Sequence, residues 1–139
     1  MSDSSVRDLP EPVAVDSWMR PSGYADVMTG RGRFVVTAGQ IGWDPSTQQF
    51  ASDDLVAQVR QTLLNVVTAV RAAGGEPTHV VRLTWYITDR DAYVTRRKEI
   101  GAVYREIMGT HYPAMAVVIV AGLVEARAQV EIEATAIVP

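Results

Sequence analysis

The stretch HYPAMAVVIVAGLVEARAQVEIEATAIVP, residues 111–139, decides the fold because it holds two strands of different polarity. The first strand, predicted over Ala114–Leu123, is apolar without interruption. The second, predicted over Gln129–Val138, alternates apolar residues with polar ones such as Glu131 and Glu133. This alternation is typical of a strand with one buried and one polar face. The chain therefore ends in two strands, of which only the second has a polar face.

The first of these strands carries apolar side chains on both faces. Val118 and Val120 point to one side, and Val117 and Ile119 point to the other. A strand that is apolar on both faces is usually buried on both faces. The sequence contains only two helical patterns, which we expect to pack on one face of the sheet. The second face must then be covered by another copy of the chain, so we predict a homo-oligomer.

Apolar residues at helical spacing predict two helices. For the first, we predict Ser52 as the cap, with Asp53 and Asp54 favouring the positive helix start, and an end at Gly74-Gly75. The second spans 91–108 and ends at Gly109. Stretches rich in β-forming residues predict further strands near 13–17 and over 24–29, 33–40 and 80–88. The glycines of Gly30-Arg31-Gly32 predict a hairpin turn between the strands 24–29 and 33–40.

The composition is that of one globular domain. The chain has 139 residues, of which 47% are hydrophobic, and a mean hydropathy of +0.04. We predict a flexible N-terminal tail over residues 1–12 and a single domain over residues 13–139. The tail is acidic and lacks the apolar core of a signal peptide, and the longest apolar run, 11 residues, is too short to span a bilayer. These features predict a cytoplasmic protein with no membrane partner.

The charge pattern argues against a nucleic-acid partner. The net charge is −3 and the pI about 5.3, which provides no general attraction for a polyanion. The one basic cluster, Arg96-Arg97-Lys98, is short and has no interleaved aromatic residues for stacking on bases. We interpret this cluster as a solvated helix face, and we do not expect Lys98 to be a Schiff-base nucleophile.

Motifs for metal, cofactor or nucleophilic catalysis are missing from the sequence. There is no cysteine, and the two histidines, His79 and His111, are not paired at a zinc-binding spacing. There is no P-loop, dinucleotide fingerprint or G-x-S-x-G motif. We therefore predict neither a cofactor nor a metal, and we interpret both histidines as ordinary loop-end residues.

Four segments together resemble the RidA/YjgF family. They are FVVTAGQIGWDPST (34–47), QVRQTLLNVVTAVRAAGG (58–75), VVRLTWYITDRDAY (80–93) and YPAMAVVIVAGLVEARAQVEIEATAI (112–137). The resemblance runs from about Tyr24 to Ile137. It implies an α+β, chorismate-mutase-like fold with two helices on one face of a mixed sheet. It also implies a homotrimer with a central barrel and three clefts between subunits, where imines or enamines are hydrolysed without cofactor or metal.

The resemblance also implies which residues line the cleft, and three of them depart from the family pattern. The arginine that follows Pro-Ala and binds the substrate carboxylate is replaced by Met115. The serine of the Ser-Gly pair is Ala38, and an asparagine on the second helix falls on Gly101. A methionine offers an adaptable apolar wall, so the cleft should prefer a ligand that is larger or has no carboxylate beside its imine. The alternative is that Met115 only fills a gap in the core.

Other positions keep the family pattern. Tyr24 matches a cleft tyrosine, Gly39 keeps the backbone of the strand end, and Glu131 matches the glutamate that opens the last strand. We predict Tyr24 and Glu131 as catalytic and Gly39, Ala38, Met115, Val117 and Gly101 as substrate-binding. Glu131 on a strand near a subunit interface can carry protons, although a solvated sheet face is the alternative for Glu131 and Glu133.

Three functions remain open from the sequence. The first is a cofactor-free hydrolase of a reactive imine, an enamine or a related small molecule, with specificity altered by Met115. The second is a non-catalytic trimer that binds a small molecule or a partner in the same clefts. The third, a ribonuclease or translation inhibitor, is disfavoured by the acidic pI. Whether Trp43, Trp85 and Tyr86 line the cleft or only pack the core stays open as well.

Overall fold

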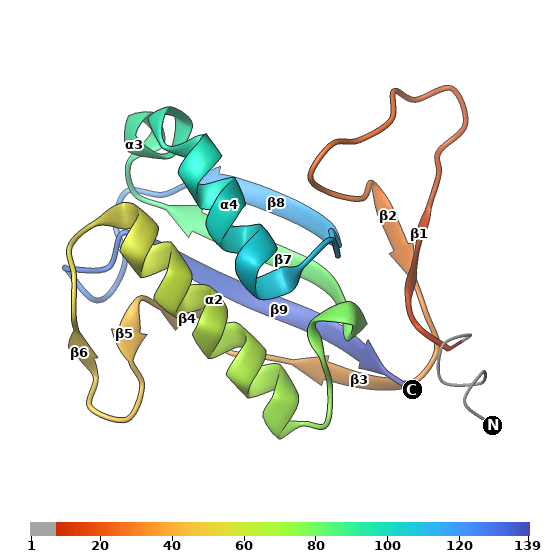
Figure 1. Cartoon of the computed structure of the whole chain (residues 1–139), viewed down its shortest axis with the longest axis horizontal. Helices are drawn as coiled ribbons and strands as arrows, with labels where there is room; N and C mark the ends of the chain where they lie inside the picture. Colours follow the sequence, from red (N-terminus) through yellow and green to blue (C-terminus); the bar gives the residue numbers. More distant parts are fainter. Residues whose placement is uncertain (1–7) are drawn as a thin grey trace.

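A computed structural model describes residues 8–139, and residues 1–7 of the predicted tail lie outside the described residues. The main sheet has the strand order β3-β9-β7-β8, with β4 also paired to β9, and two small sheets pair β1 with β2 and β5 with β6 (Figure 1). The strands are β1 (Glu11–Val13), β2 (Val27–Thr29), β3 (Arg33–Val36), β4 (Gln40–Ile41), β5 (Trp43–Asp44), β6 (Gln49–Phe50), β7 (Val80–Ile87), β8 (Ala114–Ile119) and β9 (Val130–Val138). The helices are α2 (Leu55–Ala72), α3 (Arg90–Thr95) and α4 (Arg97–Met108).

Strand β9 is the centre of the main sheet. It pairs antiparallel with β3 and β4 on one side and with β7 on the other. Along β9 every second side chain is buried, beginning at Val130 and ending at Val138, while the side chains from Glu131 to Ile137 on the other face are only partly buried. The predicted alternation is confirmed, and it gives the sheet one buried and one open face.

The helices pack on the buried face. The core joins Val59, Leu63 and Val66 of α2 and Val103 of α4 to Trp85 of the sheet, and Figure 1 shows α2 and α4 side by side over that face. Strands β7 and β8 are parallel, so their connection must cross over, and α3 and α4 form that crossover. The predicted α+β fold with two helices on one face is confirmed, although the helix predicted over 91–108 is divided at Arg96.

The face that α2 and α4 do not cover is called the open face below. By strand register it carries Phe34 and Val36 of β3, Val118 of β8 and Ile137 of β9. Phe34 and Val36 are 70% and 62% exposed. Large apolar side chains that are this exposed on one sheet face are typical of a surface that binds another protein.

The prediction of a hairpin turn at Gly30-Arg31-Gly32 is wrong. Strand β2 pairs with β1, whereas β3 pairs with β9, so the glycines connect two different sheets. Gly32 allows its own backbone to lie close to that of Val138, because a Cβ at position 32 would be only 2.3 Å from the carbonyl oxygen of Val138. The turn residues were correctly identified, but local sequence does not encode which strand becomes the partner.

Smaller differences concern strand ends. Strand β8 ends at Ile119 and not at Leu123, because the chain bends away before the loop that leads to β9. The short strand predicted near 13–17 lies at Glu11–Val13, so it begins within the predicted tail (1–12) and ends at the first residue of the predicted domain. The short hairpin of β5 and β6 was not predicted; it places Trp43 5.8 Å from Phe50, measured between ring centroids. Among the described residues, no helix is both long and apolar enough to cross a membrane.

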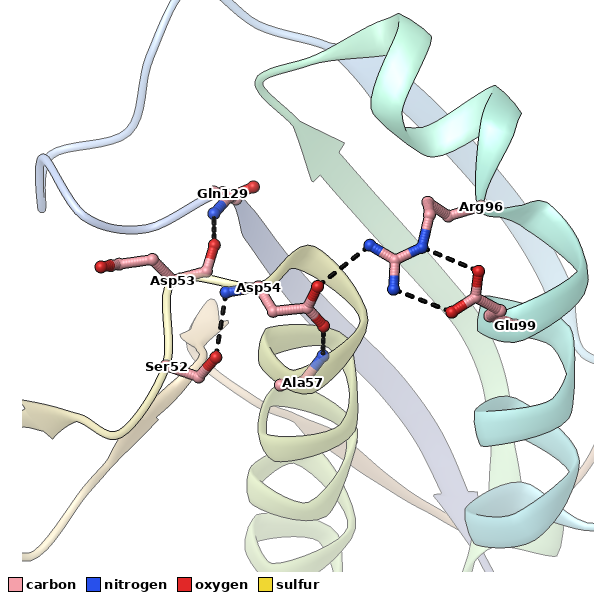
Figure 2. Close-up of polar contacts among 7 residues, drawn as sticks. All are labelled: Ser52, Asp53, Asp54, Ala57, Arg96, Glu99 and Gln129. Carbon is pink, nitrogen blue, oxygen red and sulfur yellow. Dashed lines mark hydrogen bonds and ion pairs between the residues drawn. The ribbon is translucent and has the colours of Figure 1, made fainter.

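A polar cluster joins the first turn of α2 to the start of α4, as Figure 2 shows. Asp54, and not the predicted Ser52, is the N-cap of α2, because its side chain accepts a hydrogen bond from the backbone N–H of Ala57 at 3.0 Å. The guanidinium of Arg96 donates to Asp54 at 3.0 Å and to both carboxylate oxygens of Glu99 at 2.8 Å. Ser52 accepts from the N–H of Asp54, and Gln129 donates to the carbonyl of Asp53. The cluster therefore sets where α4 begins relative to α2.

Two buried amides hold the loops around β4 and β9. Gln58 donates to the carbonyl oxygens of Ser52 and Arg127 and accepts from the N–H of Gln129. Asn65 donates to the carbonyl oxygens of Ile41 and Trp43. Backbone groups that would otherwise be buried without partners are satisfied in this way. Helix α2 consequently holds the end of β4 at a defined place.

The N-cap leads to a prediction on stability and pH. The hydrogen bond from Ala57 and the Arg96 guanidinium hold the pKa of Asp54 below its ordinary value of 3.8. Because the pKa is lowered in the folded state, the stabilisation is present above pH 3.8 and is lost as the pH falls through the folded-state pKa. Asp54→Ala should cost about 1 kcal/mol at neutral pH. Asp54→Asn keeps a capping oxygen and should cost less than about 1 kcal/mol, because the lost ion pair is exposed.

The measurement is urea unfolding of the wild type and both variants at one protein concentration, at neutral pH and at several acidic values. The gap between the wild type and Asp54→Asn should close at acidic pH. A gap that widens on acidification would contradict the assignment of Asp54 as the charged cap.

Candidate functional site

A cavity of about 610 Å³ opens between α4, the first half of β8 and the loop that precedes β2. It is called the α4 pocket below. Four of the predicted site residues line it: Tyr24, Gly101, Met115 and Val117. The other lining residues are Ser22, Gly23, Trp85, Tyr93, Arg97, Ile100, Tyr104, Arg105 and Tyr112. The structure thus brings together residues that lie more than ninety positions apart in the sequence.

Backbone contacts bring Tyr24 to this pocket. The N–H of Ala25 donates to the carbonyl of Pro113 at 3.1 Å, and Ala25 forms an isolated parallel bridge with Ala114. The loop before β2 is thereby fastened to the start of β8, next to Met115. The side chain of Tyr24 remains 44% exposed. A tyrosine held by its backbone with its side chain free is well placed to contact a bound molecule.

Met115 takes part in both the pocket and the core. In the parallel pairing of β7 and β8 it lies level with Leu83, and Val117 lies level with Trp85, so both side chains are on the helix-covered face. Met115 is half-buried, packs against the hydrophobic core and lines the α4 pocket. The sequence left open whether Met115 lines a cleft or fills a gap in the core, and its side chain contacts both the pocket and the core.

Aromatic side chains form the deep wall of the α4 pocket. Tyr104 stacks on Tyr112 with ring centroids 5.2 Å apart, and its ring centroid lies 6.4 Å from that of Trp85. The hydroxyl of Tyr104 donates to the carbonyl of His111 at 2.7 Å. Burial raises the pKa of Tyr104 well above its usual range, and burial also raises the pKa of Tyr93. These phenols are neutral at physiological pH, so the wall is uncharged.

Two arginines of α4 supply the charge of the pocket. Arg97 and Arg105 are both exposed, and Gly101 lies between them at helical spacing. A Cβ on Gly101 would lie 3.5 Å from a terminal nitrogen of Arg105, so the guanidinium of Arg105 lies beside Gly101. Sequence reasoning treated Arg97 as part of a solvated cluster and did not consider Arg105. The spacing 97, 101, 105 on one side of a helix was the signal available.

The remaining predicted site residues form a second group. Gly39 precedes β4, and a Cβ placed on it would lie 2.7 Å from the carboxyl carbon of Glu131. Ile41 of β4 is paired with Glu131 of β9 in the same region. Ala38 directly precedes Gly39. The carboxylate of Glu131 therefore lies against Gly39, and the missing Cβ of this glycine leaves space for the close approach.

The two groups lie on opposite faces of the sheet. Met115 is level with Leu83, and Leu83 is level with Ala134, which is buried beneath the helices. Glu131 has the other parity on β9 and is level with Tyr86 on the open face. Side chains of opposite parity on one strand point away from each other. One chain therefore does not unite Glu131 and Met115 in a single cavity.

The other aromatic and acidic candidates are also placed. The hydroxyl of Tyr86 donates to Glu133 at 2.7 Å on the open face. This hydrogen bond, and to a smaller extent the loss of hydration, raises the pKa of Tyr86. Trp43 packs on Phe50 and does not line the α4 pocket. Trp85 is 3% exposed and belongs to both the core and the pocket wall. Its indole N–H has no acceptor among the described residues.

The histidines have structural contacts. His79 accepts a hydrogen bond from the N–H of Glu76 at 2.9 Å, and a ring nitrogen of His111 lies 2.7 Å from the carbonyl oxygen of Val80. Within residues 8–139, no group of three His, Asp or Glu side chains is arranged to hold a metal ion. The two groups described above offer a carboxylate, phenols, guanidinium groups and backbone amides.

Comparison with known proteins places the chain in a family. The model of the family described as Endoribonuclease L-PSP matches residues 19–138. A 2-iminobutanoate/2-iminopropanoate deaminase of Salmonella typhimurium is 38% identical over 106 residues, covering 76% of this chain and 80% of that protein. The human protein of the same name is 33% identical over 105 residues, covering 76% of this chain and 73% of that protein.

Solved structures agree with this placement. A protein of the conserved Rid family from Yersinia pestis has a TM-score of 0.82 at 28% identity, covering 93% of this chain and 98% of that chain. TdcF of E. coli, solved with bound serine, has a TM-score of 0.68 at 31% identity, covering 92% and 93%. The chain belongs to the RidA/YjgF family. The predicted family and its α+β fold are thereby confirmed, and the relatives support imine deaminase chemistry at the level of the family.

The close contacts of two glycines lead to a paired prediction. A Cβ on Gly42 would lie 2.7 Å from the Cβ and 2.8 Å from the Cα of Gln58, so Gly42→Ala must push α2 away from β4. It should destabilise the protein by about 1–3 kcal/mol. Gly39→Ala meets the end of the flexible Glu131 side chain, which can move, and should cost less. Thermal unfolding of both variants tests this order, and an equal or larger loss for Gly39→Ala would contradict it.

Proposed function

We propose that this protein is a cofactor-free hydrolase of imines or enamines, acting in clefts between the subunits of a homotrimer. The observation that carries the proposal is the separation of the two residue groups, with Tyr24 and Met115 on one face of the sheet and Glu131 and Gly39 on the other. A cleft that uses both groups has to take one from each of two copies. Deaminases among the relatives supply the class of reaction.

The open face supports assembly. Phe34, Val36 and Val118 expose apolar surface there, and burying apolar surface stabilises by about 25 cal/mol per Å². A trimer that places its three open faces around a common centre buries these side chains. Light scattering at micromolar concentration should return the mass of a trimer, and a stable monomer would contradict the proposed clefts.

The proposed reaction needs little machinery. Water adds to the electrophilic carbon of the C=N bond and forms a C–O bond, while the π electrons move to the nitrogen, which gains the proton that the water loses. The hydroxyl proton then passes to the nitrogen, the C–N bond breaks, ammonia leaves with the electron pair of that bond, and the carbonyl product forms. One imine and one water therefore give one carbonyl compound and one ammonia. The protein has to orient the imine, place the water and carry protons between them.

The residues would divide this work between two subunits. The carboxylate of Glu131, held against the Ala38-Gly39 backbone, would accept a proton from the attacking water and return it to the nitrogen. The α4 pocket of the neighbouring subunit would hold the substrate with Tyr24, Gly101, Met115 and Val117 in contact. The methionine provides an adaptable apolar surface beside the imine, where a charged clamp is absent. The substrate preference should therefore shift away from small 2-imino acids.

The second candidate is a non-catalytic trimer that binds a small molecule or a partner in the same clefts. Met115, Ala38 and Gly101 favour it, because none of these residues has a side chain that can donate a hydrogen bond or a proton to a substrate. The two candidates differ in turnover. The variants below distinguish them, because a binding protein accelerates no hydrolysis with or without Glu131.

Glu131→Gln tests the catalytic proposal. The amide keeps the shape of the side chain but does not carry the proton, so kcat should fall by about 10²-fold. Glu133→Gln is the matched control on the same face of β9; its amide oxygen still accepts from Tyr86, and most of the rate should remain. The measurement is the acceleration of imine hydrolysis over the uncatalysed rate, for substrates from 2-iminopropanoate to larger aryl imines. Equal rates for the wild type and Glu131→Gln would remove Glu131 from the mechanism.

Met115→Arg tests the altered specificity. The substitution places a guanidinium beside the imine, where it can pair with the carboxylate of a 2-imino acid in two parallel hydrogen bonds. Hydrolysis of 2-iminopropanoate should rise relative to the wild type, and the gain should be partial because Ala38 and Gly101 still lack polar groups. Met115→Leu is the control of similar volume and should give no gain. If Met115→Arg remains a trimer and gains nothing, the binding-protein candidate takes first place.

A further inference from the structure

The α4 pocket is apolar at its wall and cationic at its helix. Arg97, Gly101 and Arg105 follow one another at intervals of four residues, which places them on one side of α4. All three line the pocket together with the aromatic wall and Met115. The two guanidinium groups and the apolar surface are therefore available to one bound molecule.

Neither arginine is neutralised by the protein. Within the described residues no carboxylate lies within 4 Å of the guanidinium of Arg97 or Arg105. The adjacent Arg96 differs, because it is paired with both Asp54 and Glu99. Two like charges that share a cavity without a counter-ion repel each other, and an anion that binds between them relieves this repulsion.

Gly101 lies beside the guanidinium of Arg105. A Cβ added at position 101 would lie 3.5 Å from a terminal nitrogen of Arg105, an ordinary contact distance. The side chain of Arg105 therefore reaches back along α4 to the level of Gly101, which has no side chain to cover it.

We propose that Arg97 and Arg105 bind an anionic oxygen group, a carboxylate or a phosphate monoester, on the end of the substrate remote from its imine. The apolar body of the substrate lies between them and Glu131 of the neighbouring subunit, against Met115, Trp85 and Tyr104. This rests on the proposed function for the position of the imine, but the binding of the anion is independent of turnover. The preferred substrates are accordingly larger imines whose charge is separated from the reacting carbon by an aryl or alkyl group.

The geometry supports a bound group of this kind. Guanidinium groups hold carboxylate and phosphate oxygens by charge-assisted hydrogen bonds, and two of them define direction as well as affinity. The neutral phenol of Tyr93 lines the same pocket and is a further hydrogen-bond donor. The aromatic rings of Trp85, Tyr104 and Tyr112 provide surface for an aryl body.

Equilibrium binding to the full-length protein tests the proposal without an imine. The probes are 4-phenylbutanoate, 2-phenylethyl phosphate and the uncharged 4-phenylbutanol, measured by isothermal titration calorimetry. The better of the two anions should bind at least about 10-fold tighter than the alcohol, which is the usual worth of a hydrogen bond to a charged group. Arg97→Gln and Arg105→Gln should each remove most of that preference. Arg90→Gln is the matched control, because Arg90 lies on α3 outside the pocket, and it should keep the preference.

The anion that binds more tightly identifies the substrate charge. Equal binding of both anions and the alcohol would overturn the proposal, and so would a full preference in the Arg97→Gln, Arg105→Gln double variant. Arg97→Lys keeps the positive charge and should therefore keep part of the preference for the anion. An arginine with only a structural role would not make anion binding depend on the charge at this position. Anion preference without imine turnover leaves this inference standing and contradicts the proposed hydrolase. Imine turnover without anion preference would overturn this inference and leave the proposed hydrolase standing.

Discussion

The alternating burial of β9 is the constraint on which the rest of the structure depends. This strand lies at the centre of the main sheet, with β3 and β4 on one side and β7 on the other, so its parity becomes the parity of the sheet. Its buried side chains, from Val130 to Val138, require the cover that α2 and α4 supply. The same alternation leaves Glu131 and Glu133 on the open face. A slip of one residue in the pairing of β9 would exchange the two faces and destroy both the core and the site.

That division between faces governs the function that one chain can have. The α4 pocket lies on the helix side, and Glu131 with the Gly39 backbone lies on the other. The exposed Phe34 and Val36 lie on the same face as Glu131. In the proposed trimer, the apolar surface that favours association is therefore on the same face as the carboxylate that would meet the substrate of a second copy. The proposal thus links assembly and chemistry through the parity of a single strand.

The charge of the α4 pocket comes from its helix and not from strand β8. Met115 has no charge, yet the pocket is cationic because α4 contributes Arg97 and Arg105. The orientation of α4 is set at its first turn, where Arg96 is held by Asp54 of α2 and by Glu99 (Figure 2). The three consecutive charges Arg96, Arg97 and Lys98 therefore have different environments. One fastens two helices and the next lines a cavity, which composition alone does not distinguish.

The sequence by itself determined the family, the α+β class, the helix over Leu55–Ala72 and the strands Val80–Ile87 and Val130–Val138, because each depends on local periodicity or on motifs that are contiguous in the chain. The family resemblance implied one cleft for seven residues, of which Tyr24, Gly101, Met115 and Val117 line the α4 pocket, whereas Ala38, Gly39 and Glu131 do not. Only the tertiary structure decided that β2 pairs with β1 instead of β3, that the second helix divides at Arg96, and that Arg97 and Arg105 lie in the cavity. The physical reason is that these features depend on contacts between residues far apart in the sequence. They are the choice of strand partner, a helix break held by a distant carboxylate, and the direction of a long side chain.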